Sequence, residues 1–308
     1  MSTLRTAAED YLQMRRALGY KLSSQAPLLF AFVAYLEQAH AATVTIELAV
    51  GWATAPAGAD PVWWAKRLSI ARQFARYLHT IDPACEVPPA RLLPYRARRA
   101  IPYPYTAEQI AALMRAADTL GLPLQAITYR TLIGLLAVSG MRVGETIALD
   151  RDDVDERDGL VRVINSKFGK SRVVPLHPSA MRALVAYSQQ RDQLCPRPAC
   201  EAFFVSTAGT RLHAANIRRT FTRLVGIVGI KPRSAPCRPR LHDLRHRFAI
   251  NTLLDLHRAA VDVQARLPWL ATYMGHSEVA HTFYYLTATP ELLSLVAQRL
   301  EPALEDIA

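Results

Sequence analysis

The sequence has little cysteine and no paired cysteine motif. Its cysteines are Cys85, Cys195, Cys200 and Cys237. Without a CxxC pair, neither a zinc ribbon nor a disulfide framework is predicted. One alternative is a zinc site built on Cys195 and Cys200. Its third ligand would be His213 or His242. Free thiols in a reducing compartment are favoured, and we expect no metal and no cofactor.

Long apolar runs are also missing. No stretch reaches the roughly 18–20 apolar residues that a membrane-spanning helix needs. The N-terminal MSTLRTAAEDYLQ carries acidic residues early and has no apolar core segment, so it does not resemble a secretory signal. No repeat or low-complexity tract is apparent. We therefore expect a globular protein of the cytoplasm that has no membrane partner.

Acidic residues are scarce relative to basic ones. The chain has 26 Asp and Glu against 37 Lys and Arg, a net charge of +11 and a pI near 9.8. Between Arg211 and Arg247 there are ten basic residues and a single acid, Asp243. Such a density repels itself unless phosphates are near, so it favours a polyanionic partner. A solvated basic face is the alternative.

The length of 308 residues allows two domains. Residues 1–82 show apolar side chains at helical spacing and no strand signal, which predicts a small helical bundle. Its helices are expected at 3–18, after a cap at Ser23 or Ser24, at 45–53 and at 62–79. In the last of these, Lys66 and Arg67 lie off the apolar stripe and are candidates for contact with DNA.

Residues 83–104 contain six prolines, which forbid a continuous helix. Several arginines accompany them, among them Arg96, Arg98 and Arg99. The composition predicts an interdomain linker that can follow a phosphate backbone. A disordered tether is the alternative.

Residues 105–308 are expected to form the second domain, which mixes helices with a small antiparallel sheet. Thr106 and Gln109 have the spacing of a capping box and open its first helix. Alternating residues predict two strands, joined by a turn with the sequence SKFGKS. The expected helices are 106–118, 125–138 and the segments after His213; the expected strands are 160–164, 172–176 and, as a short piece, 203–205. The predicted fold is therefore mainly α.

Four motifs in this domain carry chemistry. They are SGMRVGE at 139–145, Lys167 in the turn between the strands, HDLRH at 242–246, and Gly275-His276 with Tyr285 nine residues after the histidine. In this order and spacing they resemble the tyrosine recombinase (phage integrase) family, of the Xer-like kind. The resemblance is strongest over residues 105–290. Over residues 1–82 it is architectural, because the family carries a helical core-binding (SAM-like) domain there.

The resemblance implies three donors to the scissile phosphate: Arg142, Arg245 and His276. A guanidinium offers a planar fork of donors to two phosphate oxygens. Fixed donors aimed at the equatorial oxygens of the phosphorane lower the barrier. Glu145, one helical turn after Arg142, matches an acidic position that orients the site. Pairing with Arg142 at the surface would be its ordinary structural role.

The remaining catalytic positions follow from the same resemblance. Tyr285 is the nucleophile, and its neighbour Tyr284 is an aromatic companion. Lys167 protonates the departing 5′ oxygen, with Lys170 as a competing candidate. His242 accepts the tyrosine proton or binds the phosphate. It lies three residues before Arg245 on a predicted helix, so the two side chains share a face.

Further basic residues are expected to touch DNA outside the reacting phosphate. These candidates are Lys66, Arg67, Arg96, Arg98, Arg99, Lys170, Arg172, Arg218 and Arg219. Phosphate contacts position a protein on DNA, whereas base contacts give sequence specificity. The target sequence is therefore not readable from these residues.

The predicted activity is site-specific recombination or integration of DNA through a 3′-phosphotyrosyl intermediate, without metal or ATP and for a mobile element. The predicted partner is double-stranded DNA carrying recombination sites. We expect a homotetramer on DNA and a monomer or dimer in its absence. The C-terminal segment after Pro290 would either cover the chain's own core or dock into a neighbouring protomer. Two alternatives remain, a type IB topoisomerase-like enzyme and a DNA-binding protein without catalysis.

Overall fold

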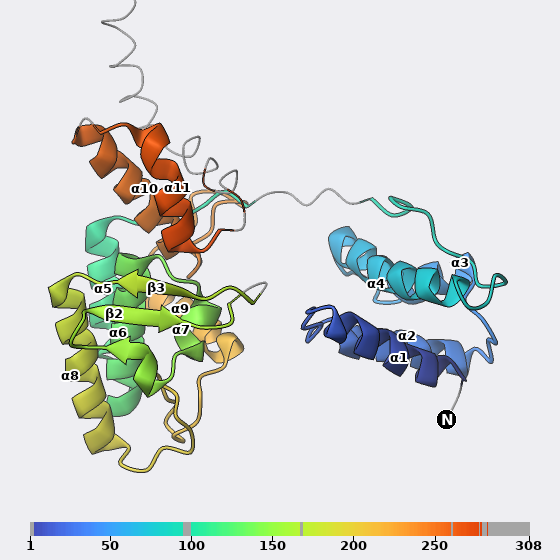
Figure 1. Cartoon of the computed structure of the whole chain (residues 1–308), viewed down its shortest axis with the longest axis horizontal. Helices are drawn as coiled ribbons and strands as arrows, with labels where there is room; N and C mark the ends of the chain where they lie inside the picture. Colours follow the sequence, from blue (N-terminus) through green and yellow to red (C-terminus); the bar gives the residue numbers. More distant parts are fainter. Residues whose placement is uncertain are drawn as a thin grey trace, which may run out of the picture. The chain divides into compact units, whose positions relative to one another are not determined.

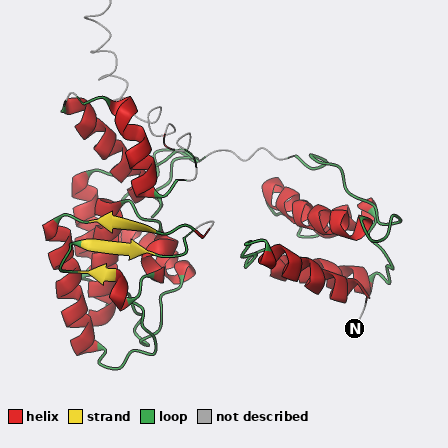
Figure 2. Ribbon diagram, viewed as in Figure 1, coloured by secondary structure: helices red, strands yellow, loops and turns green. Residues whose placement is uncertain are grey.

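The computed structural model describes residues 3–94, 100–166, 169–259 and 261–276, together with Glu278 and Thr282. The chain divides into two compact units, Met1–Arg99 and Ala100–Ala308 (Figure 1). Among the described residues, helices predominate in both units, and the strands all belong to the second (Figure 2). Among the described helices, none is both long and apolar enough to span a bilayer.

The first unit is a bundle of helices, as its apolar periodicity predicts. Its elements are α1 (Thr3–Ala17), α2 (Ala26–Gln38), α3 (Ile46–Thr54) and α4 (Pro61–His79). Thr45 and Asp60 begin α3 and α4 by accepting backbone N–H bonds through their side chains. Phe32 and Trp52 pack ring against ring, with centroids 4.9 Å apart, in a core that also buries Phe74. This bundle fixes the direction of the basic side chains on α4.

The proline-rich segment expected to be a linker packs against the units over much of its described length. Cys85 is buried in the core of the first unit, and the amide of Glu86 donates to the carbonyl of Val44 at 2.8 Å. Near the other end, Tyr103 and Tyr105 are buried in the core of the second unit. Residues 95–99, which include the candidate Arg96, Arg98 and Arg99, lie outside the described residues.

The second unit places a small sheet against helices. Its first elements are α5 (Ala107–Ala117), α6 (Pro123–Ser139), α7 (Val143–Ala148), the 3-10 turn Arg151–Asp153, β1 (Val154–Asp155) and β2 (Leu160–Val163). After these come β3 (Arg172–Pro175), α8 (Pro178–Leu194), α9 (Ala214–Val228), α10 (Asp243–Arg258) and α11 (Val263–Met274). The predicted capping box is present, since the Thr106 side chain and the Gln109 side chain each accept the other's backbone N–H.

The described strands form one antiparallel sheet in the order β1-β2-β3. Val161 pairs with Val174, and both are fully buried against the helices behind the sheet (Figure 2). The predicted hairpin of β2 and β3 is confirmed. The expected strand at 203–205 is wrong, because the segment takes part in a single isolated bridge, that of Val205 with Arg211. Strand β1 was not anticipated.

Candidate active site

Two successive helices place Arg142 and Glu145 next to each other. Helix α6 ends at Ser139 and is capped by Gly140. Gly140 has a φ of 60°, which favours glycine, and a Cβ atom there would collide with the Phe248 ring. Arg142 then stands at the N-terminus of α7. Its backbone N–H donates to Glu145 at 2.9 Å, and its Nη1 donates to the same carboxylate at 2.7 Å. The turn therefore fixes both the backbone and the guanidinium of Arg142.

Arg245 enters the same region from the first turn of α10. Its side chain is buried, with the residue only 2% exposed. Nη1 donates to the Gly140 carbonyl at 2.6 Å, and Nη2 donates to the Met274 carbonyl at 2.7 Å. Arg245 thus connects the end of α6 to the end of α11.

Several side chains of the site contact the C-terminus of α11. Its last carbonyls have no partner within the helix, as at every helix C-terminus. Here the carbonyls of Tyr273, Met274 and Gly275 accept hydrogen bonds from three different arginines. Arg172 donates to the Tyr273 carbonyl at 2.7 Å, and Arg245 donates to the Met274 carbonyl at 2.7 Å. Arg142 donates to the Gly275 carbonyl at 3.0 Å. The helix end is therefore held by positive charge, which suits the negative end of its dipole.

His276 follows directly. Gly275 closes α11 with a φ of 68° and turns the chain back toward the helix, so that the His276 amide donates to the Ala271 carbonyl at 2.9 Å. The Nδ1 of His276 lies 2.7 Å from the hydroxyl oxygen of Thr282. The fold thus brings the predicted phosphate donors Arg142, Arg245 and His276 together around one helix end.

Glu145 carries a stabilised negative charge in this site. Burial alone would raise its pKa, but hydrogen bonds from Arg172 and from the Arg142 backbone and side chain lower it to about 2. Its side chain is 5% exposed and is shared by the two guanidiniums. The carboxylate stays ionised at any ordinary pH and keeps the cations at fixed positions.

His242 occupies the N-cap position of α10, and its ring meets that of His246 edge to face at 5.2 Å. Partial burial of the ring lowers its pKa, and the neighbouring Arg245 lowers it further, while Asp243 acts in the opposite direction. A neutral imidazole can accept a proton. Asp243 is itself buried and forms an ion pair with Arg240, which lies two residues before the HDLRH motif.

Two central predicted residues, Lys167 and Tyr285, lie outside the described residues, as does Tyr284. Lys170 is exposed, and its carbonyl accepts the Ser166 amide at 2.8 Å in the described part of the turn.

The predicted DNA contacts fall into two groups. Lys66, Arg218 and Arg219 are exposed. Arg67 is half-buried, stacks on the Trp52 ring at 3.9 Å and donates to the Trp52 carbonyl. Arg172 differs most from the expectation of a DNA contact: its side chain is 11% exposed, and all three guanidinium nitrogens donate to protein acceptors. Its position in the sequence, at the start of a strand, gave no sign of these partners.

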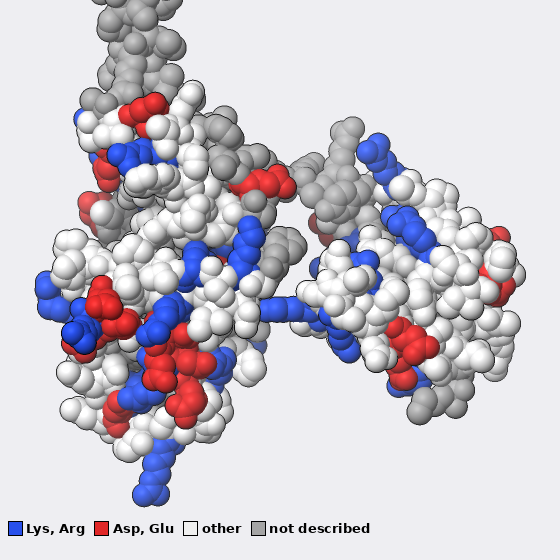
Figure 3. Space-filling model, viewed as in Figure 1, with Lys and Arg blue, Asp and Glu red and all other residues white. Residues whose placement is uncertain are grey.

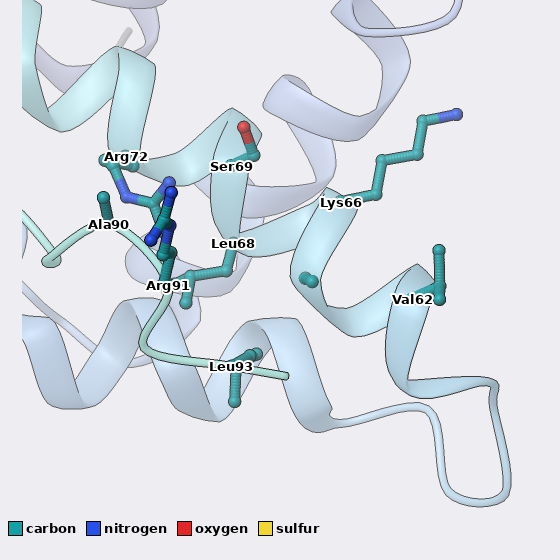
Figure 4. Close-up of a pocket in the computed structure, with 9 residues that line it drawn as sticks. Val62, Lys66, Leu68, Ser69, Arg72, Ala90, Arg91 and Leu93 are labelled. Atoms are coloured by element: carbon teal, nitrogen blue, oxygen red, sulfur yellow. The ribbon is translucent and has the colours of Figure 1, made fainter. Parts of the chain in front are cut away.

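A pocket of about 430 Å³ in the first unit has three basic residues in its lining, Lys66, Arg72 and Arg91 (Figure 4). Lys66 and Arg72 lie on α4 and Arg91 on the loop after it, and Leu68 and Leu93 belong to the apolar part of the lining. Arg91 has a φ of 64°, a left-handed conformation that is costly for a residue with a Cβ. On the face drawn in Figure 3, by contrast, acidic and basic side chains lie mixed on both units.

The zinc alternative finds no geometric support. All four cysteines are free thiols. Within the part of the chain that the structure describes, no three His, Cys, Asp or Glu side chains come together as a metal site would require. The site's described chemistry is that of arginine, histidine and one carboxylate.

On a mainly helical fold, these groups place two predicted phosphate donors, Arg142 and Arg245, and the buried Glu145 carboxylate around one helix end. The profile of the Phage integrase family matches residues 105–291. The chain belongs to this family of tyrosine recombinases, whose members are site-specific recombinases.

Relatives extend the match to both units. The protein y4rB of Sinorhizobium fredii, named as a candidate integrase/recombinase, is 43% identical over 99% of each chain. The tyrosine recombinase XerC of Pelotomaculum thermopropionicum is 30% identical over 77% of this chain and 74% of its own.

Solved structures share the fold. The integrase of transposon Tn1549, solved in complex with transposon right end DNA, matches with a TM-score of 0.63 at 18% identity. The match covers 96% of this chain and 99% of the integrase chain. The XerH recombinase bound to palindromic difH substrate matches with a TM-score of 0.62 at 17% identity, over 91% and 80% of the two chains. At these identities the likeness concerns the fold alone.

Proposed function

We propose that the chain recombines specific DNA sites, as part of a mobile element, by forming a 3′-phosphotyrosyl bond through Tyr285. The convergence of Arg142, Arg245 and His276 on the C-terminus of α11 supports this more than any other observation. Donors fixed in this way need no reorganisation when negative charge develops on the phosphorane.

The proposed step balances without metal or nucleotide. The Tyr285 oxygen bonds to phosphorus while the bond from phosphorus to the 5′ oxygen breaks. His242, whose lowered pKa favours the neutral ring, accepts the phenolic proton, and Lys167 donates a proton to the 5′ oxygen. The covalent link conserves the phosphodiester energy, so that a 5′ hydroxyl can reverse the step.

The proposed partner is double-stranded DNA carrying recombination sites, bound by both units. Both structural neighbours named above were solved with DNA, which supports this partner. Exchange of two strand pairs between two sites requires four active tyrosines, so we propose a homotetramer on DNA and a monomer or dimer off it. The activity belongs where such DNA lies, at the nucleoid in the cytoplasm.

A nicked suicide substrate tests the proposal. The binding site is first located by footprinting on DNA that flanks the gene, and a duplex of that site is then nicked beside the scissile phosphate. Loss of the short fragment that carries the 5′ hydroxyl traps the intermediate, so we expect a DNA-linked protein band on a denaturing gel and Tyr285 in the linked peptide. Tight binding without a covalent band would favour a DNA-binding protein that lacks catalysis.

The topoisomerase-like alternative predicts a covalent band as well, but no partner site. A four-way junction formed from two labelled copies of the site separates the two activities. Accumulation of that junction supports recombination. Relaxation of supercoiled DNA without any junction would assign the chain to the alternative.

Binding to DNA should depend steeply on salt, because released counterions drive phosphate contacts. For six phosphate contacts, affinity should fall by about 10³ between 50 and 200 mM salt. We expect Lys66→Ala, which removes an exposed cation at the pocket of Figure 4, to lower the slope of log K against log salt by about one. Fluorescence anisotropy at several salt concentrations measures the slope.

The matched control is Arg5→Ala in the same unit, since Arg5 pairs with Glu9 one helical turn away. It should leave the slope unchanged. A flat salt response of the wild type would contradict binding through the phosphate backbone.

A further inference from the structure

We infer that Arg172 is a positioning residue of the active site, which holds Glu145 and the end of α11 in place for Arg142 and His276, and does not contact DNA. The inference rests on the proposed function. Arg172 was expected to touch DNA from the sequence, so the two roles make opposite predictions.

The first support is the full use of the Arg172 guanidinium inside the protein. Nη1 and Nη2 donate to the two carboxylate oxygens of Glu145 at 3.1 and 2.9 Å, and Nε donates to the Tyr273 carbonyl at 2.7 Å. A bidentate pair with a third bond fixes the plane of the guanidinium.

The second support is that the bonds of Arg172 allow Arg142 to use one of its Nη atoms outside the pair with Glu145. Because Arg172 donates to both oxygens of Glu145, Arg142 needs only Nη1 for that carboxylate and uses Nη2 for the Gly275 carbonyl. Without Arg172, Arg142 would be the one cationic partner left to the buried charge of Glu145 among the described residues. Arg142 would then be drawn toward Glu145 and away from the helix end.

The third support is the close fit at Gly275. A Cβ on Gly275 would lie 2.7 Å from Nη1 of Arg172, and the residue has a φ of 68°. Glycine is therefore needed here both for the turn and for the passage of the guanidinium. A second contact ties β3 to α11, since the hydroxyl of Tyr273 lies 3.4 Å from the Pro175 carbonyl. The backbone of residues 273–275, which leads into His276, is thus held in place by the Arg172 guanidinium.

The test is to replace Arg172 by methionine, which keeps the aliphatic stem and removes the charged fork. We expect the single-turnover cleavage rate at saturating DNA to fall by about 10- to 100-fold, as loss of an orienting partner does elsewhere. The Kd for DNA and its salt slope should stay within twofold of wild type. A change in Kd and slope with an unchanged cleavage rate would show that Arg172 contacts DNA and would overturn the inference.

The matched control is Arg162→Met on the neighbouring strand. Arg162 lies opposite Val173 in the register, and its half-exposed side chain pairs with Asp155 at 3.5 Å. This variant should keep both the rate and the Kd. An unchanged cleavage rate in Arg172→Met as well would overturn the inference, while a covalent adduct in wild type would still uphold the proposed function. If wild type forms no adduct, the proposed function fails and the inference falls with it.

A coupling measurement separates positioning from a general loss of stability. Gly275→Ala should lower the cleavage rate in wild type, because its Cβ meets the guanidinium. In Arg172→Met the Nη1 and Cζ atoms are absent, so the same substitution should cost a smaller factor. Equal factors in both backgrounds would contradict the proposed fit. Should Arg172→Met not fold, Arg172→Lys takes its place: it keeps the charge but not the fork, and we expect a folded, DNA-binding protein that still cleaves slowly.

Discussion

Replacing Tyr285 by phenylalanine is expected to abolish the covalent protein–DNA adduct, with a fall in strand cleavage of about 10⁴-fold or more. The substitution removes the one atom that bonds to phosphorus in the proposed step. Loss of a covalent nucleophile has effects of this size or larger in other enzymes. DNA affinity should remain within a factor of about three, because a phenol contributes no charge to counterion release. The adduct is measured with the nicked substrate on a denaturing gel.

Tyr284 provides a matched control in the neighbouring position. Tyr284→Phe removes the same hydroxyl one residue earlier and should keep the adduct. If the adduct persists in Tyr285→Phe and disappears in Tyr284→Phe, the nucleophile is Tyr284. If it persists in both single variants and also in the double variant, attack by a tyrosine at these two positions is excluded.

The sequence predicted the elements whose signals are local. The apolar stripe and basic face of α4 follow from a spacing of 3.6 residues, and the capping box of Thr106 and Gln109 depends on side chains three residues apart. The hairpin of β2 and β3 also has an alternating pattern. Strand β1, of only two residues, is too short to show any period. Residues 203–205 have the apolar character of a strand but lie buried among rings, such as that of Tyr187.

The sequence predicted those site residues that belong to recognisable motifs, but not the contacts that hold them. Arg142, Glu145, Arg245 and His276 were assigned by their motifs, and the structure shows them sharing one helix end. Apart from the Glu145 carboxylate, the acceptors that hold the side chains of Arg142 and Arg245 are backbone carbonyls, which no residue type reveals.

The same limit explains Arg172. An arginine at a strand start gives no indication of whether it faces solvent or a buried carboxylate. The answer depends on Glu145, 27 positions earlier, and on Tyr273, 101 positions later. Long-range contacts of this kind decide which basic residues remain available to DNA, and net charge cannot do so.

Arg245 gives the second large effect. We expect Arg245→Lys to lower single-turnover cleavage by about 10²- to 10³-fold, the range found when one fixed donor to a reacting oxyanion is removed. The guanidinium bonds the carbonyls of Gly140 and Met274 at once, through two nitrogens of a rigid fork. An ammonium group is a single point of charge and cannot reproduce that fork. Quench-flow cleavage of the nicked substrate measures the rate.

The control for Arg245 is Arg258→Lys at the other end of α10, where the side chain is 67% exposed and pairs with Asp255. It should leave cleavage unchanged. Arg245 also connects α6 to α11, so thermal unfolding has to be measured alongside the rate. A variant that is folded at the assay temperature, binds DNA and cleaves slowly places Arg245 at the phosphate. A variant that cleaves at the wild-type rate once folded would instead limit Arg245 to holding the two helix ends together, and Arg142 and His276 would remain as the phosphate donors.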